Sequence, residues 1–224
     1  GNVVTGKYPL KGEYPVNMTA TARAGQVAGT QTVMIEETNY AMLNDPVLNM
    51  LTGGIDDLDG KTWIIDKEMI GHMGVGPTNT KWPDWWQAGP NAKEGTGLYT
   101  DEYTFNLNGL AYTQETSGTV FVNGAHADAF PGAVDAPGGD LMADYTAPDG
   151  LNFSVSENAD GNPVINITDP GWIGFYTGVK SYEVLEISDD EMFIRFGDSK
   201  NDLVWYHRLV RKGYERPVEE KPIE

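Results

Sequence analysis

Three of the six tryptophans in this sequence, Trp82, Trp85 and Trp86, lie within five residues of one another. The surrounding stretch, residues 71–103, is rich in glycine and proline, so its middle is expected to be a long loop. Long ordered loops in compact domains are often functional. An indole offers a flat apolar face and one N–H donor, which suits stacking on a pyranose ring. The alternative is that these indoles close the open end of a β structure and serve packing only.

Other side chains could supply hydrogen bonds or further stacking surface to the same ligand. Trp172 follows Pro170 and Gly171 in an expected turn, where it either joins the loop indoles or packs against the fold. The remaining candidate ligand-binding residues are Asp84, Gln87, Asn91, His72 and His126. Because these groups are polar and few, they predict contacts to the hydroxyls of a neutral polysaccharide or oligosaccharide.

Hydrolysis of such a glycan is the first alternative, because glycosidases use two carboxylates on either side of the bond they cleave. The candidate pairs are Asp101 with Glu102 and Glu115 with Asp128. In an extended segment Asp101 and Glu102 point to opposite faces, so they cannot share a site. The sequence contains neither an E-x-D-x-E arrangement nor a G-x-S-x-G nucleophile motif. We therefore predict no catalytic residue.

Metal binding has little support in the sequence. There are three histidines without paired spacing and no cysteine, so thiolate sites and disulfides are excluded. The acidic stretches 56–60 and 135–144 offer oxygen ligands, which calcium prefers, but neither has the spacing of an EF-hand loop. We expect no cofactor and no metal, with calcium as the alternative.

The composition indicates a globular chain of 224 residues with 40% hydrophobic residues. Its net charge of −18 excludes nucleic acid and anionic membrane surfaces as partners, because both attract basic proteins. A neutral ligand fits this charge best. No apolar run approaches the length of a membrane-spanning helix.

Short strand patterns separated by turn signals predict an all-β protein, either an antiparallel sandwich or a barrel. Tight turns are expected at 108–109 and 188–191, and a loop over 123–144. A short helix should begin after Asp45 and end at Gly53-Gly54. The expected strands are 12–22, 30–35, 61–65, 98–107, 110–116, 119–122, 151–155, 164–167, 182–187, 192–196 and 203–209.

Two resemblances add to this reading. The pattern G-x-Y-x-V-x-x-x-A-T over residues 12–21, followed by T-V-x-I over residues 32–35, resembles the closing strands of a PKD-type immunoglobulin-like module. A second set of motifs is similar to the C-terminal domain that follows PKD modules in Bacteroidetes surface glycan-binding lipoproteins of polysaccharide-utilisation loci. That set comprises residues 51–54, 61–63, 71–77, 85–90, 174–178, 182–187 and 205–208.

The resemblance implies a sandwich or lipocalin-like barrel on the extracellular face of the outer membrane, held by a lipid anchor outside this chain. It also implies other polysaccharide-uptake proteins as partners. The expected organisation is a partial immunoglobulin-like segment (1–39), a linker with a short helix (40–60), a glycan-binding domain (61–212) and a charged tail (213–224). A glycoside hydrolase, a lipocalin-like binder of a small apolar ligand and a purely adhesive spacer remain the alternatives.

Overall fold

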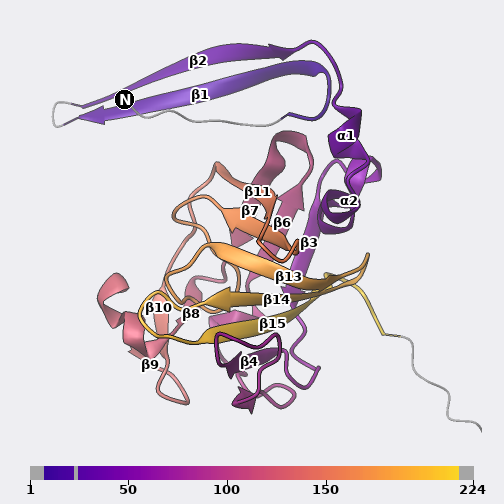
Figure 1. The fold of residues 1–224 in the computed structure, drawn as a ribbon. Coiled ribbons are helices and arrows are strands. Elements are labelled where there is room, and N and C mark those ends of the chain that lie inside the picture. Colours follow the sequence, from indigo (N-terminus) through magenta and orange to yellow (C-terminus); the bar gives the residue numbers. More distant parts are fainter. Residues whose placement is uncertain (1–7, 23–24, 217–224) are drawn as a thin grey trace, which may run out of the picture.

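The computed structural model describes residues 8–22 and 25–216, and its main body is a closed antiparallel β barrel (Figure 1). The neighbour order is β14-β13-β12-β11-β7-β6-β3-β15, and pairing of β14 with β15 closes the ring. The sequence expectation of an all-β fold is thus confirmed, and of its two forms the barrel is present. The barrel strands are β3 (Lys61–Ile65), β6 (Glu102–Asn106), β7 (Ala111–Glu115), β11 (Leu151–Glu157), β12 (Pro163–Ile167), β13 (Ser181–Ile187), β14 (Glu191–Gly197) and β15 (Val204–Arg211).

Strand β15 closes the barrel and also extends it. Its C-terminal half pairs with β3, where Leu209 faces Ile65. Its N-terminal half pairs instead with β4 (Met73–Gly76), which in turn pairs with the two-residue strand β5 (Trp86–Gln87). The β4–β5 hairpin therefore projects from the barrel wall as an extra piece of sheet.

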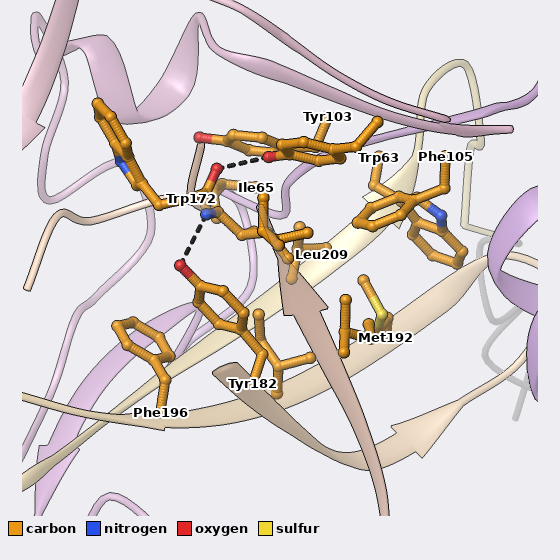
Figure 2. Packing of buried hydrophobic residues seen from close by; sticks show 14 of the residues in the cluster. Trp63, Ile65, Tyr103, Phe105, Trp172, Tyr182, Met192, Phe196 and Leu209 are labelled. Carbon is orange, nitrogen blue, oxygen red and sulfur yellow. Dashed lines mark hydrogen bonds between the residues drawn. The ribbon is translucent and has the colours of Figure 1, made fainter. Parts of the chain in front are cut away.

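Large side chains fill the inside of the barrel. Along each strand alternate residues point inward, as the pleat requires, and β3 shows this with buried Trp63 and Ile65. Figure 2 shows Trp63 packed with Phe105, Met192 and Leu209. Aromatic rings and branched chains occupy the interior among the described residues, so the barrel resembles a packed core rather than a lipocalin-like container.

One end of the barrel is closed by residues 171–176, a segment we call the plug. Backbone groups of the plug bond to side chains that rise from the barrel interior. The Tyr112 hydroxyl donates to the Trp172 carbonyl at 2.5 Å, and the Ile173 N–H donates to the Tyr182 hydroxyl at 2.8 Å. Figure 2 labels Trp172 and Tyr182 and marks hydrogen bonds between the residues drawn with dashed lines. These bonds satisfy polar groups that would otherwise be buried without partners.

A small sheet lies against the plug through a bridge between Val122 and Tyr176. It consists of β8 (Thr119–Val122), β10 (Leu141–Asp144) and β9 (Val134–Asp135), and the 3-10 helix η4 (Gly124–Ala129) follows β8. The expectation of a continuous loop over 123–144 was therefore wrong. The strands formed there are short, and the pairing of β10 with β8 and with β9 is not visible as a periodic pattern.

The N-terminal part is a long hairpin of β1 (Gly12–Ala22) and β2 (Gly25–Ile35), which extends away from the barrel (Figure 1). Almost all of β2 is exposed, and the Asn39 N–H bonds to the Pro9 carbonyl at the base of the hairpin at 2.7 Å. Both expected strands, 12–22 and 30–35, lie in this hairpin, with β2 beginning earlier than expected.

Two short helices link the hairpin to the barrel, α1 (Tyr40–Leu43) and α2 (Pro46–Thr52). The expected helix is confirmed as α2: the Asp45 carboxylate accepts from Val47 N–H and Leu48 N–H, and Gly53 ends the helix with φ 84°. Single 3-10 turns occur at η1 (Gly54–Asp56), η2 (Gly97–Tyr99) and η3 (Asn108–Leu110). In the part of the chain that the structure describes, no helix has the length and apolar character needed to cross a membrane.

Candidate functional site

The three clustered tryptophans lie on the hairpin that projects from β15, which we call the flap (residues 73–87). Their side chains are well exposed, with 47% of Trp82, 58% of Trp85 and 41% of Trp86 accessible to solvent. All three indoles thus reach solvent, as stacking on a ligand requires. Large apolar side chains gathered on a surface mark a candidate binding site.

Close packing holds the flap in one shape. A Cβ at Gly74 would lie 2.5 Å from the ring of Pro83, and one at Gly76 would lie 2.8 Å from the Trp82 carbonyl oxygen. Only glycine leaves room for the loop to fold back onto β4 at these two positions. The Trp85 N–H also donates to the Val75 carbonyl at 3.1 Å, which fixes the loop just before β5.

The loop is fastened to the outer barrel wall as well. The Tyr206 hydroxyl donates to the Thr80 carbonyl at 2.8 Å, and the Arg195 guanidinium donates to the Thr78 carbonyl. These bonds come from neighbouring strands β15 and β14. The backbone that carries the indoles is therefore held from two sides, so little ordering is needed when a ligand arrives.

Trp82 packs on the outer wall of the barrel. Its ring meets Phe193 edge-on at 6.0 Å between centroids, and the Arg208 guanidinium carbon lies 5.6 Å from the Trp82 ring and 4.0 Å from that of Phe193. Such cation–aromatic contacts stabilise both groups. Beside Phe193 and Arg208 is a hollow of about 190 Å³ that also contains Glu186 and Asp66.

Trp86 has different neighbours. The Lys93 ammonium lies 5.4 Å from the centre of the Trp86 ring and 5.1 Å from that of Phe121. Lys93 is buried and pairs with Asp140 at 3.3 Å. The buried, paired Lys93 ammonium therefore contacts the Trp86 ring on its protein side and stabilises its position, while much of the ring remains in solvent.

The strand register and the ring contacts together place Trp86 and Trp82 on opposite faces of the flap sheet. Trp205, Val75 and Trp86 are aligned across β15, β4 and β5, so their side chains share one face. Tyr206 is next to Trp205 and therefore lies on the other face, where it stacks on Phe193 at 5.8 Å. Trp82 contacts that same Phe193. The expected single aromatic surface is thus two surfaces separated by the sheet.

The polar candidates of the loop differ in how exposed their side chains are. Asp84 is exposed between the indoles, and Asn91 is exposed in the following turn, where its N–H donates to the Lys67 carbonyl at 2.8 Å. Gln87 is half-buried and is the register partner of Gly74, so it points to the face opposite Trp86. Asp84 and Asn91 are therefore the better placed of the three for contact with a ligand.

The two histidine candidates are buried and hydrogen-bonded within the protein. His72 bonds through Nδ1 to the Met69 carbonyl at 2.7 Å and through Nε2 to the Tyr99 hydroxyl at 2.6 Å. Burial lowers its pKa, which favours the neutral ring. His126 is paired with Asp198 at 3.0 Å. Neither ring has a free surface, so both hold loops in place.

Trp172 is also buried, with 1% of its surface accessible. It is the centre of the plug, where Phe130, Tyr145 and Tyr176 surround it at ring-centroid distances of 6.0, 4.7 and 4.9 Å. Its indole N–H donates to the Gly174 carbonyl at 3.0 Å. Of the two roles expected for this residue, packing matches its position.

The carboxylates weighed for hydrolysis do not form a facing pair on β6. Asp101 is 1% exposed and lies on the inner side of the barrel wall, whereas Glu102 points outward to Lys212 at 2.6 Å. Of the other pair, Asp128 is engaged with Lys200 at the surface. The opposite orientation expected for Asp101 and Glu102 is confirmed.

The acidic stretches considered for calcium lie close to cationic side chains of the protein. Asp56 and Asp57 line a hollow of about 560 Å³ that also holds the cations Lys61 and Arg211. Asp140, from the second stretch, pairs with Lys93. No cluster of three or more histidine or carboxylate side chains suited to a metal ion occurs in residues 8–22 and 25–216.

The residues that sequence reasoning missed are the supports of the indoles. Arg208 and Phe193 come from β15 and β14, far from the loop in the chain. Alternation along β15 could have placed Arg208 on the same face as Tyr206, but not beside Trp82. Comparison with protein-family models and with curated proteins finds no match to this sequence.

Proposed function

We propose that this protein binds a neutral polysaccharide without cleaving it, through Trp82, Trp85 and Trp86. The observation that carries the proposal is the exposure of these three indoles, between 41% and 58%, on a loop fastened to the barrel. A purely structural cluster would bury such large apolar rings, because each can remove 150–250 Å² of surface from water.

Indole faces match the apolar faces of sugar rings, whose axial hydrogens form flat patches. By analogy with bases stacked on aromatic side chains, each stacked ring contributes about 1–3 kcal/mol. The fixed loop increases the share of this energy that appears as affinity, because little conformational entropy is lost on binding. Asp84 and Asn91 are exposed nearby and supply hydrogen bonds to hydroxyl groups.

The charge of the chain supports an uncharged ligand. At a net charge of −18, the protein repels polyanions such as sulfated or uronate-rich glycans. Of the cations beside the indoles, Lys93 is paired with Asp140, and Arg208 lies over the ring of Phe193. A neutral glycan can therefore bind without breaking either of these contacts.

The rival functions have less support. A lipocalin-like binder needs an internal cavity, whereas the described interior is filled by side chains such as Trp63 and Phe105. A hydrolase needs two carboxylates that face a substrate, and Asp101 is sealed inside the wall. The resemblance to surface glycan-binding lipoproteins supports a position on the outer membrane beside other polysaccharide-uptake proteins.

A glycan array on the whole chain is the first test, followed by calorimetric titration of neutral oligosaccharides. Replacing Trp82, Trp85 or Trp86 by alanine should weaken binding about tenfold where the ring is stacked, since 1.4 kcal/mol is a decade in affinity. Tyr40, which is 71% exposed on α1, provides the control, and Tyr40→Ala should leave binding unchanged.

Two results would contradict the proposal. One is a loss of thermal stability in all three tryptophan variants without any selective loss of binding, which would make the cluster a packing element. The other is sustained release of reducing ends from β-glucan, mannan or xylan that disappears when one Asp or Glu is changed.

A further inference from the structure

Trp82 and Trp86 lie on opposite faces of the flap: the register of β15, β4 and β5 places Trp86 on the face of Trp205, and the contact with Phe193 places Trp82 on the face of Tyr206. Building on the proposed function, we propose that these faces form two separate subsites, each binding a short segment of neutral glycan. One molecule then holds two chains, or two segments of a chain that passes around the flap edge.

The first subsite is built on the outer barrel wall. Phe193 and Arg208 are register partners on β14 and β15, and both contact Trp82. The Trp82 ring is 47% exposed despite these contacts, so a face remains for stacking. The Arg208 side chain keeps 24% of its surface accessible, and its nearest carboxylate, Glu186, is 3.9 Å away and 73% exposed. Its N–H groups can therefore donate to sugar hydroxyls beside the indole.

The second subsite continues the inner face of the barrel sheet. Trp86 follows Val75 and Trp205 across the strands, and Lys93 covers the buried side of its ring. Trp86 is 41% exposed, Val75 and Trp205 are half-buried, and the three side chains form a row perpendicular to the strands. Neighbouring strands are about 4.8 Å apart, so this row spans about 10 Å, comparable with a disaccharide unit.

A single straight chain cannot stack on both indoles. The β4 backbone separates them, and the loop at Pro83 lies directly on Gly74 with no room for a ligand between them. The two subsites also share no supporting residue, since Phe193 and Arg208 serve one and Lys93 and Phe121 serve the other. Substitutions in groups without shared partners act independently.

The test follows the indole N–H signals of the ¹⁵N-labelled whole chain while cellotetraose, mannotetraose or xylotetraose is added. Trp82→Ala and Trp86→Ala identify each signal, and melting curves verify that both variants are folded. We expect both signals to shift. Removing one indole should change the Kd measured at the other by less than about twofold. Tyr40→Ala should leave both titrations as they are.

The alternatives give different results. A single continuous site predicts that Trp82→Ala weakens the titration seen at Trp86 about tenfold, or the reverse. That outcome, or a response from only one of the two indoles, would overturn the two-subsite arrangement while glycan binding itself stands. If neither indole responds to any of the three tetrasaccharides, the proposed function fails and the subsites fail with it.

Discussion

Asp101 is a buried carboxyl group that, within the described residues, makes no hydrogen bond to another side chain. Burial raises its pKa to about 8, and the nearby Ser117 backbone only partly offsets this rise. Tyr103 and Gln114, register partners on β6 and β7, also have buried polar atoms without partners, the hydroxyl and the side-chain nitrogen. The wall of the barrel thus contains a cluster of buried polar groups, and a charge on Asp101 in this position is energetically unfavourable.

Asp101→Asn should change how stability depends on pH. Because the pKa of the acid is raised in the folded state, the native protein holds its proton between about pH 4 and about pH 8 while the unfolded chain has lost it. This group therefore lowers the free energy of unfolding as pH rises through that window, by about 1.4 kcal/mol per pH unit. The Asp101→Asn variant has no ionisable group at this position, so its free energy of unfolding lacks this pH dependence.

Urea unfolding at about pH 5 and about pH 7 measures the effect. The free energy of unfolding of the wild type, relative to that of Asp101→Asn, should fall by about 2 kcal/mol or more between these values. Parallel pH curves for the two proteins would show that Asp101 is ionised in the folded state, contrary to the effect of its burial.

Gly174, in the plug, tests the close packing over the barrel end. Its φ is 67°, and a Cβ there would lie 2.6 Å from the His207 ring, which accepts a bond from the Phe175 N–H. Gly174→Ala should lower the free energy of unfolding by about 2 kcal/mol or more, measured in urea. Gly89→Ala, with nothing within 4 Å of the added carbon, is the matched control and should stay within about 0.5 kcal/mol of the wild type. Equal effects would mean that the plug can move aside.

Among the elements, the β1–β2 hairpin contributes little to the barrel. Among the described residues its strands pair only with each other, and the side chains of β2 are nearly all exposed. Replacing residues 12–35 by a short Gly-Ser linker keeps Pro9 and Asn39, which join at its base. The thermal midpoint of the barrel should then change by less than about 4 °C, the shift produced by about 1 kcal/mol in a domain of this size. A drop above about 10 °C would show that the hairpin supports the barrel.

Local signals predicted most of the elements. Asp45, Pro46 and Gly53 mark the ends of α2, and the turn at 188–191 joins β13 to β14, because capping and turn chemistry act over a few residues. The expected tight turn at 108–109 joins the paired strands β6 and β7, in the form of the 3-10 turn η3, in which Gly109 and Leu110 both have positive φ.

The site could be predicted only in part for the same reason. The sequence shows three tryptophans close together in a loop. Their division between two faces depends on the pairing of β4 with β15, which lies more than 100 residues later in the chain. Barrel closure also depends on such distant pairs. The burial of His72, His126 and Trp172 follows from packing between loops, which no local pattern encodes.

At the scale of the whole molecule, 33 acidic residues oppose 15 basic ones. Their mutual repulsion disfavours the compact state and is screened by salt. Raising NaCl from about 20 mM to about 500 mM should therefore raise the thermal midpoint, because isolated surface ion pairs, which salt also weakens, contribute little. A midpoint that falls with salt would show that ion pairs outweigh the repulsion.

The position of β15 in the barrel sets an order for folding during synthesis on the ribosome. This strand closes the ring with β14, pairs with β3 from the start of the barrel and supports β4 of the flap. The earlier strands are therefore made long before the partner that completes them, and distant pairings of this kind form slowly. Until residues 204–211 leave the ribosome, β3 and β4 each present an unpaired edge, and Trp82 lacks Arg208 as a packing partner. The nascent chain is most exposed to aggregation in this interval, so a chaperone that binds apolar strands would act then.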